Sequence, residues 1–160
     1  MKKIILILSV ILVLFLVSCD KSDAFASSDY SVAETSISLS SVLPDGIVYE
    51  SGTERELDAD FTDYYFGNKE LLNGVDSYVF ITSPTTAVNE VGVFKVTSKE
   101  ARDALLEAFN TRRDNLIQIH TNYSAEDLAV SENLKSGSFD DIVYFTATPD
   151  NEKIEALIKR

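Results

Sequence analysis

The position of the only cysteine limits what this chain can fold into. Cys19 lies directly behind an apolar run from Ile4 to Val17, and Lys2 and Lys3 precede that run. The residues after Cys19 contain no thiol, so a disulfide, a thiolate metal site and a thiol nucleophile are excluded there. That part of the chain, about 140 residues, has to be stabilised by ordinary packing, and its length is enough for one domain with a substantial core.

The first 18 residues have the three parts of an export signal. The apolar run is 14 residues long, shorter than the about 20 residues that a membrane-spanning helix needs, but within the about 7–15 expected of a signal-peptide core. Leu16-Val17-Ser18-Cys19 resembles the lipobox of bacterial lipoproteins, in which the cysteine receives a diacylglycerol and the chain is cut before it. The resemblance implies lipidation of Cys19, a signal peptide over residues 1–18 and a location on the outer face of the cell membrane. An uncleaved anchor and an ordinary secretory signal are the alternatives.

The chain is strongly acidic, with 14 Lys and Arg residues against 26 Asp and Glu residues and a formal net charge of −12. Loss of Lys2 and Lys3 with the signal peptide would make the charge −14. An acidic surface argues against nucleic acid as a partner and against adsorption to anionic lipids or wall polymers. We therefore expect membrane contact through the lipid on Cys19, because two acyl chains give stable anchoring.

Composition changes at about residue 35. Residues 19–35 are rich in Ser, Asp and Ala and contain few large apolar side chains, which is typical of a flexible tether. Residues 36–160 contain the regular apolar patterns, and their length suits a single domain. We expect a cleaved segment 1–18, a tether 19–35 and one folded domain 36–160.

The patterns in residues 36–160 predict an α+β fold. Three β-prone apolar runs predict strands covered on both faces, the first two paired as a hairpin: residues 75–82, 91–96 and 142–147. Apolar residues at helical spacing predict helices over residues 37–42, 54–66 and 97–120, after Ser124 and after Asp150. These elements predict a small, mainly antiparallel sheet of three strands, with four strands as the alternative, and helices packed on it.

The predicted helix over residues 54–66 has an apolar stripe and an acidic face. Leu57, Phe61, Tyr64 and Tyr65 have helical spacing, so we expect Tyr64 or Tyr65 to be buried or half-buried. At the start of the next long helix, Thr97 and Glu100 match a capping box, in which the side chain of Thr97 would accept the N-cap hydrogen bond.

The acidic face of the same segment raises the question of a calcium site. Asp58, Asp60 and Asp63 stand close together, but a helix–loop–helix calcium loop needs Gly at its sixth position and Glu at its twelfth. Counted from Asp58, these positions hold Asp63 and Lys69. We therefore interpret the acids as a solvated helix face and expect no metal, no cofactor and no catalytic residue in the chain.

Several short motifs carry a resemblance to a known family through their order and spacing. They are Glu90-Val-Gly-Val-Phe-Lys-Val96, a helix with Ala101, Leu105 and the pair Arg112-Arg113, then Tyr123, and Gly137 before Ile142-Val-Tyr-Phe145. The chain resembles, over about residues 54–158, the small lipoproteins of Gram-positive bacteria that carry a C-terminal domain of unknown function (domain of unknown function 4358). The family supplies no activity, so the resemblance implies the architecture and the location only.

Arg112 and Arg113 are the candidate partner-binding residues. One of them lies beside the apolar stripe of its helix, so its guanidinium either forks onto a carboxylate of the domain or receives an anionic group of a partner. His120, at the end of that helix, is expected to cap the last carbonyls or to be exposed. Seven tyrosines would suit a surface that binds sugars or peptides, although their spacing places most of them in the core.

Three functions are compatible with the sequence. The favoured one is a non-enzymatic interaction or binding module, held at the membrane and facing an envelope protein or a cell-wall component. The second is a small envelope hydrolase that uses a carboxylate pair, which requires two carboxyl groups in one cleft with separated pKa values. The third is a lipoprotein that binds a small molecule.

Overall fold

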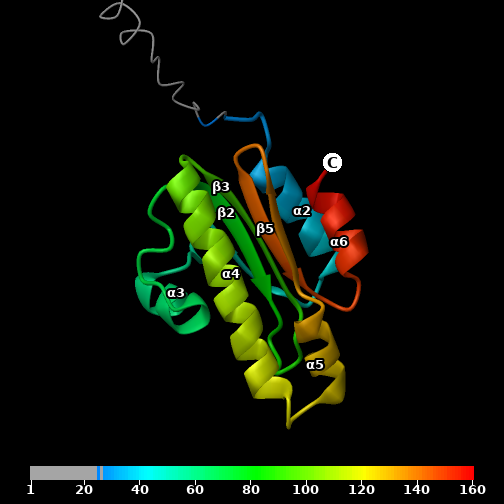
Figure 1. The fold of residues 1–160 in the computed structure, drawn as a ribbon. Helices are drawn as coiled ribbons and strands as arrows, with labels where there is room; N and C mark the ends of the chain where they lie inside the picture. Colours follow the sequence, from blue (N-terminus) through cyan, green and yellow to red (C-terminus); the bar gives the residue numbers. More distant parts are fainter. Residues whose placement is uncertain (1–24, 26) are drawn as a thin grey trace, which may run out of the picture.

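The computed structural model describes residue 25 and residues 27–160. The predicted signal peptide, Cys19 and the first part of the predicted tether lie outside these residues. The described chain folds into one sheet with helices on both of its faces (Figure 1). None of the helices in this part of the chain has the length and hydropathy needed to span a membrane.

Within the described residues, five strands form one sheet in the order β1-β2-β3-β5-β4, and every neighbouring pair is antiparallel. The strands are β1 (Ile47–Glu50), β2 (Val75–Thr82), β3 (Glu90–Val96), β4 (Lys135–Phe139) and β5 (Ile142–Ala147). The α+β class and the hairpin of β2 with β3 are confirmed. The prediction of three or four strands was too low, because the edge strands β1 and β4 gave no clear signal.

The helices cover the two faces of the sheet as separate layers (Figure 1). One face packs against two helices near the chain ends, the other face packs against two helices from the middle, and a short helix follows the longest one. In chain order they are α2 (Val32–Val42), α3 (Ala59–Phe66), α4 (Lys99–His120), α5 (Ala125–Glu132) and α6 (Asn151–Ile158). Helices α2 and α6 form the first layer, and α3 and α4 form the second.

The core between the sheet and α3 and α4 is aromatic. Five phenylalanines are fully buried there: Phe66, Phe80, Phe94, Phe109 and Phe145. The rings of Phe109 in α4 and Phe145 in β5 have centroids 4.7 Å apart, and Phe66 in α3 reaches the same β5 ring at 6.0 Å. Burial of each such side chain stabilises the fold by about 1.5–3 kcal/mol, so this layer fixes α3 and α4 on the sheet.

The core on the opposite face is aliphatic. Alternate residues of β2 and β3 point to this side, as the period of a strand requires, and they pack against α2 and α6. The buried side chains include Val79, Ile81, Val91, Val93, Ile142, Ile154 and Ile158, with Leu39 from α2. Both faces of the central strands are therefore dry, which explains their continuous apolar runs.

The chain is attached to the domain earlier than the sequence predicts. Ser28 donates to Asp141 from its backbone N–H (3.0 Å) and from its hydroxyl group. Lys95 donates from Nζ to the carbonyl oxygens of Ser28 (2.7 Å) and Tyr30 (3.4 Å), and Tyr30 donates to the carbonyl oxygen of Ile158 (2.9 Å). The predicted tether over residues 19–35 is thus too long at its C-terminal end, because this segment is bound from Ser28 and helical from residue 32.

Three helices begin at other residues than predicted. The helix expected at residue 37 begins at Val32, and the one expected at residue 54 begins after Asp58, whose side chain accepts from the N–H of Phe61 as an N-cap. The cap of α4 is Ser98, which accepts from the N–H of Ala101, whereas the hydroxyl of Thr97 donates to the carbonyl oxygen of Gly74. The predicted cap of α5 by Ser124 is confirmed.

Candidate functional site

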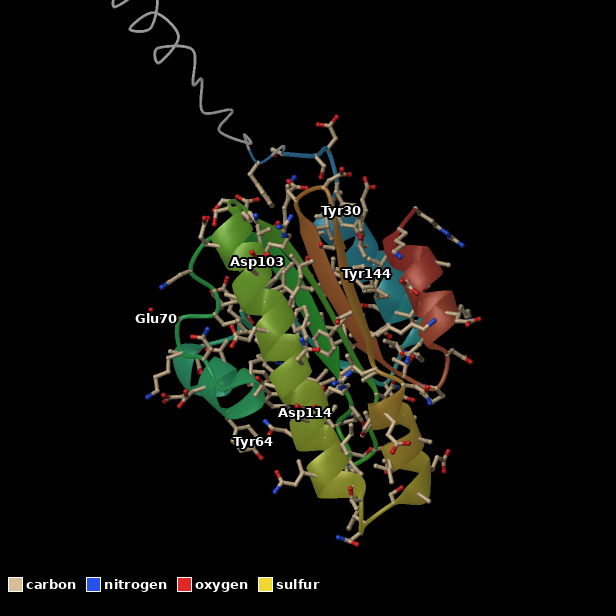
Figure 2. The ribbon with its side chains drawn as sticks, viewed as in Figure 1. Tyr30, Tyr64, Glu70, Asp103, Asp114 and Tyr144 are labelled. Carbon is tan, nitrogen blue, oxygen red and sulfur yellow. The ribbon has the colours of Figure 1, made fainter. Side chains whose placement is uncertain are left out.

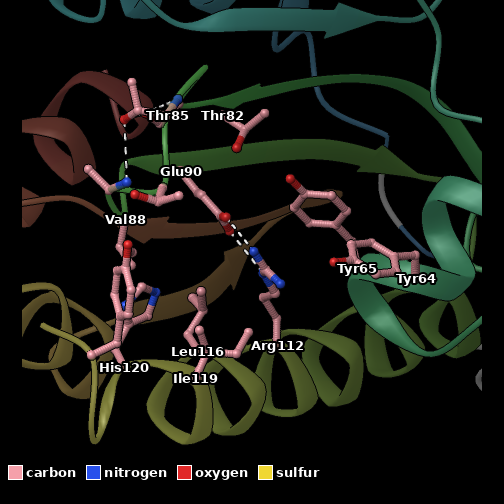
Figure 3. Close-up of a pocket in the computed structure, with 14 residues that line it drawn as sticks. Tyr64, Tyr65, Thr82, Thr85, Val88, Glu90, Arg112, Leu116, Ile119 and His120 are labelled. Carbon is pink, nitrogen blue, oxygen red and sulfur yellow. Dashed lines mark hydrogen bonds and ion pairs between the residues drawn. The ribbon is translucent and has the colours of Figure 1, made fainter.

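A hollow lies on the face covered by α3 and α4, at the end where β2 finishes and β3 begins. Its volume is about 450 Å³. Side chains from β2, β3, α3 and α4 line it together with the loop between β2 and β3 (Figure 3). We call it the α3–α4 pocket. A volume between about 300 and 1,000 Å³ is usual for sites that bind small ligands.

A buried ion pair forms the inner wall of the α3–α4 pocket. Arg112 of α4 donates from Nε to one oxygen of Glu90 (3.0 Å) and from Nη2 to the other (2.5 Å), which is the bidentate geometry that guanidinium and carboxylate groups favour. The two residues are 8% and 4% exposed. The pair therefore brings two planar, hydrogen-bonding groups to the pocket with no net charge.

The Arg112 guanidinium also packs on an aromatic column in α3. Its Cζ lies 4.3 Å from the ring centroid of Tyr65, a distance that favours a cation–π contact. The rings of Tyr65 and Phe61, one helical turn apart, are stacked with centroids 4.3 Å apart. Burial raises the pKa of the Tyr65 hydroxyl, so this group is a neutral donor and acceptor at the pocket.

The rim of the α3–α4 pocket exposes large aromatic and apolar side chains. Tyr64 is 81% exposed, Tyr123 is 69% exposed and Ile119 is 57% exposed. Figure 2 shows Tyr64 projecting outward from α3. Of the two tyrosines expected on the apolar stripe, Tyr65 is the half-buried one: the helix turns Phe61 and Tyr65 toward the sheet, and Tyr64 points to the rim.

His120 closes the pocket at the end of α4. It is only 5% exposed, so the expected exposure was wrong, while its expected place as the basic residue in the last turn of α4 is as predicted. Its Nδ1 atom has no hydrogen-bond partner among the described residues and lies 3.9 Å from Oδ2 of Asp127. The N–H of Val88 donates to the other carboxylate oxygen (2.8 Å) and lowers the pKa of Asp127, so this group stays charged beside the imidazole.

The loop between β2 and β3 adds hydroxyl groups to the open side. Thr82, Ser83, Thr85 and Thr86 all line the pocket. Ser83 and Thr85 are hydrogen-bonded to each other (2.8 Å), and their hydroxyls accept from the N–H groups of Thr85 and Ala87. The loop is thus held by its own side chains, and its surface is neutral and polar.

The structure separates the two predicted partner-binding residues. Arg112 forks onto a carboxylate of the domain, which is one of the two predicted alternatives, and it lines the pocket. Arg113 lies outside the pocket lining, with Nη2 3.5 Å from Asp114. Glu90, Tyr64 and Tyr123 were not predicted as site residues, because only the fold brings the start of β3, α3 and the segment after α4 together.

A second hollow offers the acids that a hydrolase of the predicted kind would need, but in an exposed setting. Glu126, Asp150 and Glu152 line it, and all three are exposed, Glu152 to 93%. Two exposed carboxylates are not held in the different environments that separate an acid from a base. Among the described residues, no group of His, Cys, Asp and Glu is placed to hold a metal ion.

No protein-family model, curated protein or solved structure matches the chain. The family resemblance seen in the sequence therefore stays a prediction, and the candidate site has to be judged on its own geometry.

Proposed function

We propose that this protein is a lipid-anchored lipoprotein on the outer face of the bacterial cell membrane, and that its domain is a non-enzymatic binding module with the α3–α4 pocket as its binding site. The observation that carries the binding function is the position of the exposed apolar side chains. The described residues include four large hydrophobic side chains that are widely exposed, and Tyr64, Ile119 and Tyr123 surround this one pocket. Ile37 of α2 is the fourth and lies on the other layer.

Clustering of this kind has a physical meaning. Scattered exposed apolar residues are ordinary on a protein surface, whereas a group of them around a hollow marks an interaction site. Tyrosine in particular offers a flat apolar face and a polar tip, and it loses little conformational freedom on binding. The rim therefore has the composition of a surface that is covered by a ligand.

The inner wall supports binding over catalysis. Both carboxylate oxygens of Glu90 accept hydrogen bonds from Arg112, so this acid is held in a bidentate ion pair. Among the described residues it is also the only carboxylate that lines the α3–α4 pocket. Hydrolysis by a carboxylate pair would need a second acid there, and for this reason the binding function is favoured over the enzymatic one.

Binding is tested with the full chain, purified in detergent, and with cell envelopes of the bacterium that produces it, from which the lipids have been extracted so that the lipid on Cys19 has no bilayer to enter. We expect the wild-type chain to sediment with the envelopes. The double variant Tyr64→Ala, Tyr123→Ala removes the rim rings and should weaken the association at least tenfold, since aromatic anchors contribute about 1–2 kcal/mol or more each. Ile37→Ala, an equally exposed residue on the other layer, is the matched control and should bind as the wild type does. Equal binding by all three chains would refute the proposed site.

The location is tested by lipid labelling. Cells fed with an alkyne-labelled fatty acid should incorporate the label into the wild-type chain and not into Cys19→Ser, while the domain of the variant still unfolds cooperatively. If the Cys19→Ser chain carries the label, the lipid is elsewhere. If neither chain carries it and both stay in the membrane, the first 18 residues are an uncleaved anchor.

A further inference from the structure

We infer that the α3–α4 pocket binds a neutral saccharide unit, stacked on its tyrosine rim and hydrogen-bonded to the Glu90–Arg112 pair. This inference rests on the proposed binding function and names the ligand class for the same site. Its basis is the combination of three kinds of group in one hollow: exposed aromatic faces, a buried planar ion pair without net charge, and hydroxyl groups.

The aromatic faces suit one side of a sugar ring. A pyranose presents C–H groups on its face and hydroxyl groups around its edge. Tyr64 and Tyr123 are exposed over more than two thirds of their surfaces and carry π-electron faces that attract the weakly positive C–H groups. Because their hydroxyl tips stay wet, these rings contact a polar ligand at little desolvation cost.

The ion pair suits the edge of the same ring. A guanidinium has five N–H donors, and Arg112 uses Nε and Nη2 on Glu90, so other donors are left. Each carboxylate oxygen of Glu90 has two lone pairs and accepts one bond from Arg112. A pair of neighbouring sugar hydroxyls, each able to donate and accept, matches this side-by-side set of donors and acceptors.

The charge of the pocket selects against other ligands. Arg112 and Glu90 cancel each other, and the whole chain carries −12, so neither phosphate nor carboxylate groups are attracted. A purely apolar peptide side chain would cover the remaining donors of Arg112 without replacing their hydrogen bonds to water. A buried donor left without a partner weakens binding. A neutral polar ligand avoids both penalties.

His120 provides a further polar atom in the wall. Its side chain is more than nine-tenths buried, lines the pocket, and has no hydrogen-bond partner for Nδ1 among the described residues. Its ring centroid lies 6.2 Å from that of Tyr123, so the imidazole and one of the rim tyrosines belong to the same end of the site. Unpaired buried polar groups are uncommon in folded proteins and call for a partner.

The decisive experiment compares envelopes that have lost either protein or glycan. The full chain is kept in a detergent without a sugar headgroup and is sedimented with lipid-extracted envelopes that are otherwise untreated, protease-treated or periodate-oxidised. Because periodate cleaves neighbouring hydroxyls, we expect oxidation to reduce binding at least tenfold, and we expect protease treatment to leave binding unchanged. Maltotriose and xylotriose, whose units carry neighbouring hydroxyls, are then measured by calorimetry to identify the type of sugar.

The outcomes separate the two proposals. Binding to untreated envelopes that survives oxidation, or that protease treatment abolishes, overturns the saccharide inference while the binding function stands. Failure of the wild-type chain to bind untreated envelopes, or equal binding by the rim variant and Ile37→Ala, overturns the proposed function itself. Loss of binding on oxidation alone supports the saccharide class, and a trimer that binds should lose at least tenfold in affinity to the rim variant and not to Ile37→Ala.

Discussion

At the scale of single residues, Asp141 carries a charge with no exposed surface. Burial alone would raise the pKa of this carboxyl, but the hydrogen bonds from the hydroxyl and N–H of Ser28, together with Lys95 at 3.7 Å, outweigh burial and lower it. Because the same contacts hold the chain at Ser28, the ionised state of Asp141 attaches the N-terminal segment to β3 and β5.

The lowered pKa makes this attachment depend on pH. A carboxyl whose pKa is lower in the folded protein than in the unfolded chain stabilises the fold above the unfolded value of about 3.9, and the stabilisation is lost as pH falls toward the folded value. We expect the free energy of unfolding in urea to decrease as pH falls from about 5 toward 2. Asp141→Asn should cost about 1–3 kcal/mol at pH 7 and flatten this part of the profile. If the free energy of unfolding depends on pH in the same way in the wild type and in Asp141→Asn, Asp141 is not the group responsible.

The Glu90–Arg112 pair leads to a different prediction, because both partners are buried. Removal of one partner leaves an uncompensated charge, and we expect Glu90→Leu or Arg112→Met alone to cost about 3–5 kcal/mol. The double variant leaves no buried charge, so its free energy of unfolding should decrease by less than that of either single variant. Urea unfolding of the three variants tests this.

The double variant also separates stability from function. If the pair is present for ligand binding, the folded double variant should sediment poorly with envelopes. A folded double variant that binds the envelopes as the wild type does would mean that the pair has a mainly structural role. A double variant that costs as much as the two single variants together would mean that the two side chains stabilise the fold independently, and it would contradict the ion-pair argument.

At the scale of elements, the strand β3 depends on a residue without a side chain. Gly92 pairs with Phe80 on one side and Phe145 on the other. A Cβ atom at this position would lie 2.5 Å from the ring of Phe145 and 2.7 Å from the ring of Phe94. The glycine therefore makes room for the aromatic core that positions α3 and α4.

Gly92→Ala should consequently destabilise the domain through crowding, by about 1–3 kcal/mol, because the rings that surround it are buried. Gly52→Ala is a useful comparison. Gly52 has φ +78 and nothing within 4 Å of the added carbon, so its cost comes from the backbone alone, about 1 kcal/mol. Thermal unfolding and near-UV circular dichroism should show altered aromatic packing only for Gly92→Ala. Unchanged stability in that variant would contradict the packing described for β3.

The same elements show what the sequence could predict. The runs in β2, β3 and β5 are apolar on both faces, so their strand character was visible without the fold. β1 has only four residues, and β4 (KSGSF) consists mostly of Lys, Ser and Gly, which have weak strand preference. Each of these two segments is a strand because it pairs with an antiparallel neighbour. Their own residues do not reveal that pairing.

The candidate site was predicted less well than the fold. The sequence indicated that one of Arg112 and Arg113 would fork onto a carboxylate, but it did not indicate Glu90, which lies 22 positions away and enters the pocket through the register of β3. Tyr64 has the spacing of a core residue and yet is exposed. Its role depends on how α3 is rotated on the sheet, and the short helix leaves that rotation to tertiary packing.

At the scale of the whole molecule, the attachment of the chain and the α3–α4 pocket lie at opposite ends of the sheet. Ser28 contacts Asp141 just before β5 and Lys95 near the end of β3, whereas the pocket lies at the end of β2 and the start of β3. Tyr30 lies two residues after Ser28, and Figure 2 shows it at the end of the molecule opposite to α5. In the anchored protein that we propose, the pocket points away from the membrane.

This orientation can be measured along α4, whose 22 residues span about 33 Å between the two ends. The proposed lipidation would consume the only cysteine, so Glu100→Cys and Asn122→Cys would each introduce a unique, exposed thiol at one end of α4. The eight residues between Cys19 and Ser28 reach at most about 30 Å. On vesicles that contain quencher lipids, a fluorophore at residue 100 should be quenched more than one at residue 122. Equal quenching would mean that the domain lies on its side.

The placement of β3 has a mechanical consequence. This central strand contains Lys95 near one end and Glu90 at the other. Lys95 donates to the carbonyl oxygen of Ser28 in the N-terminal segment, and Glu90 lines the pocket. A pull between membrane and bound ligand would run along the strand axis, and antiparallel hydrogen bonds lie perpendicular to it. Such a load shears the bonds of β3 with β2 and β5 together instead of opening them one by one. In the anchored protein that we propose, β3 would therefore resist a pull between its two ends.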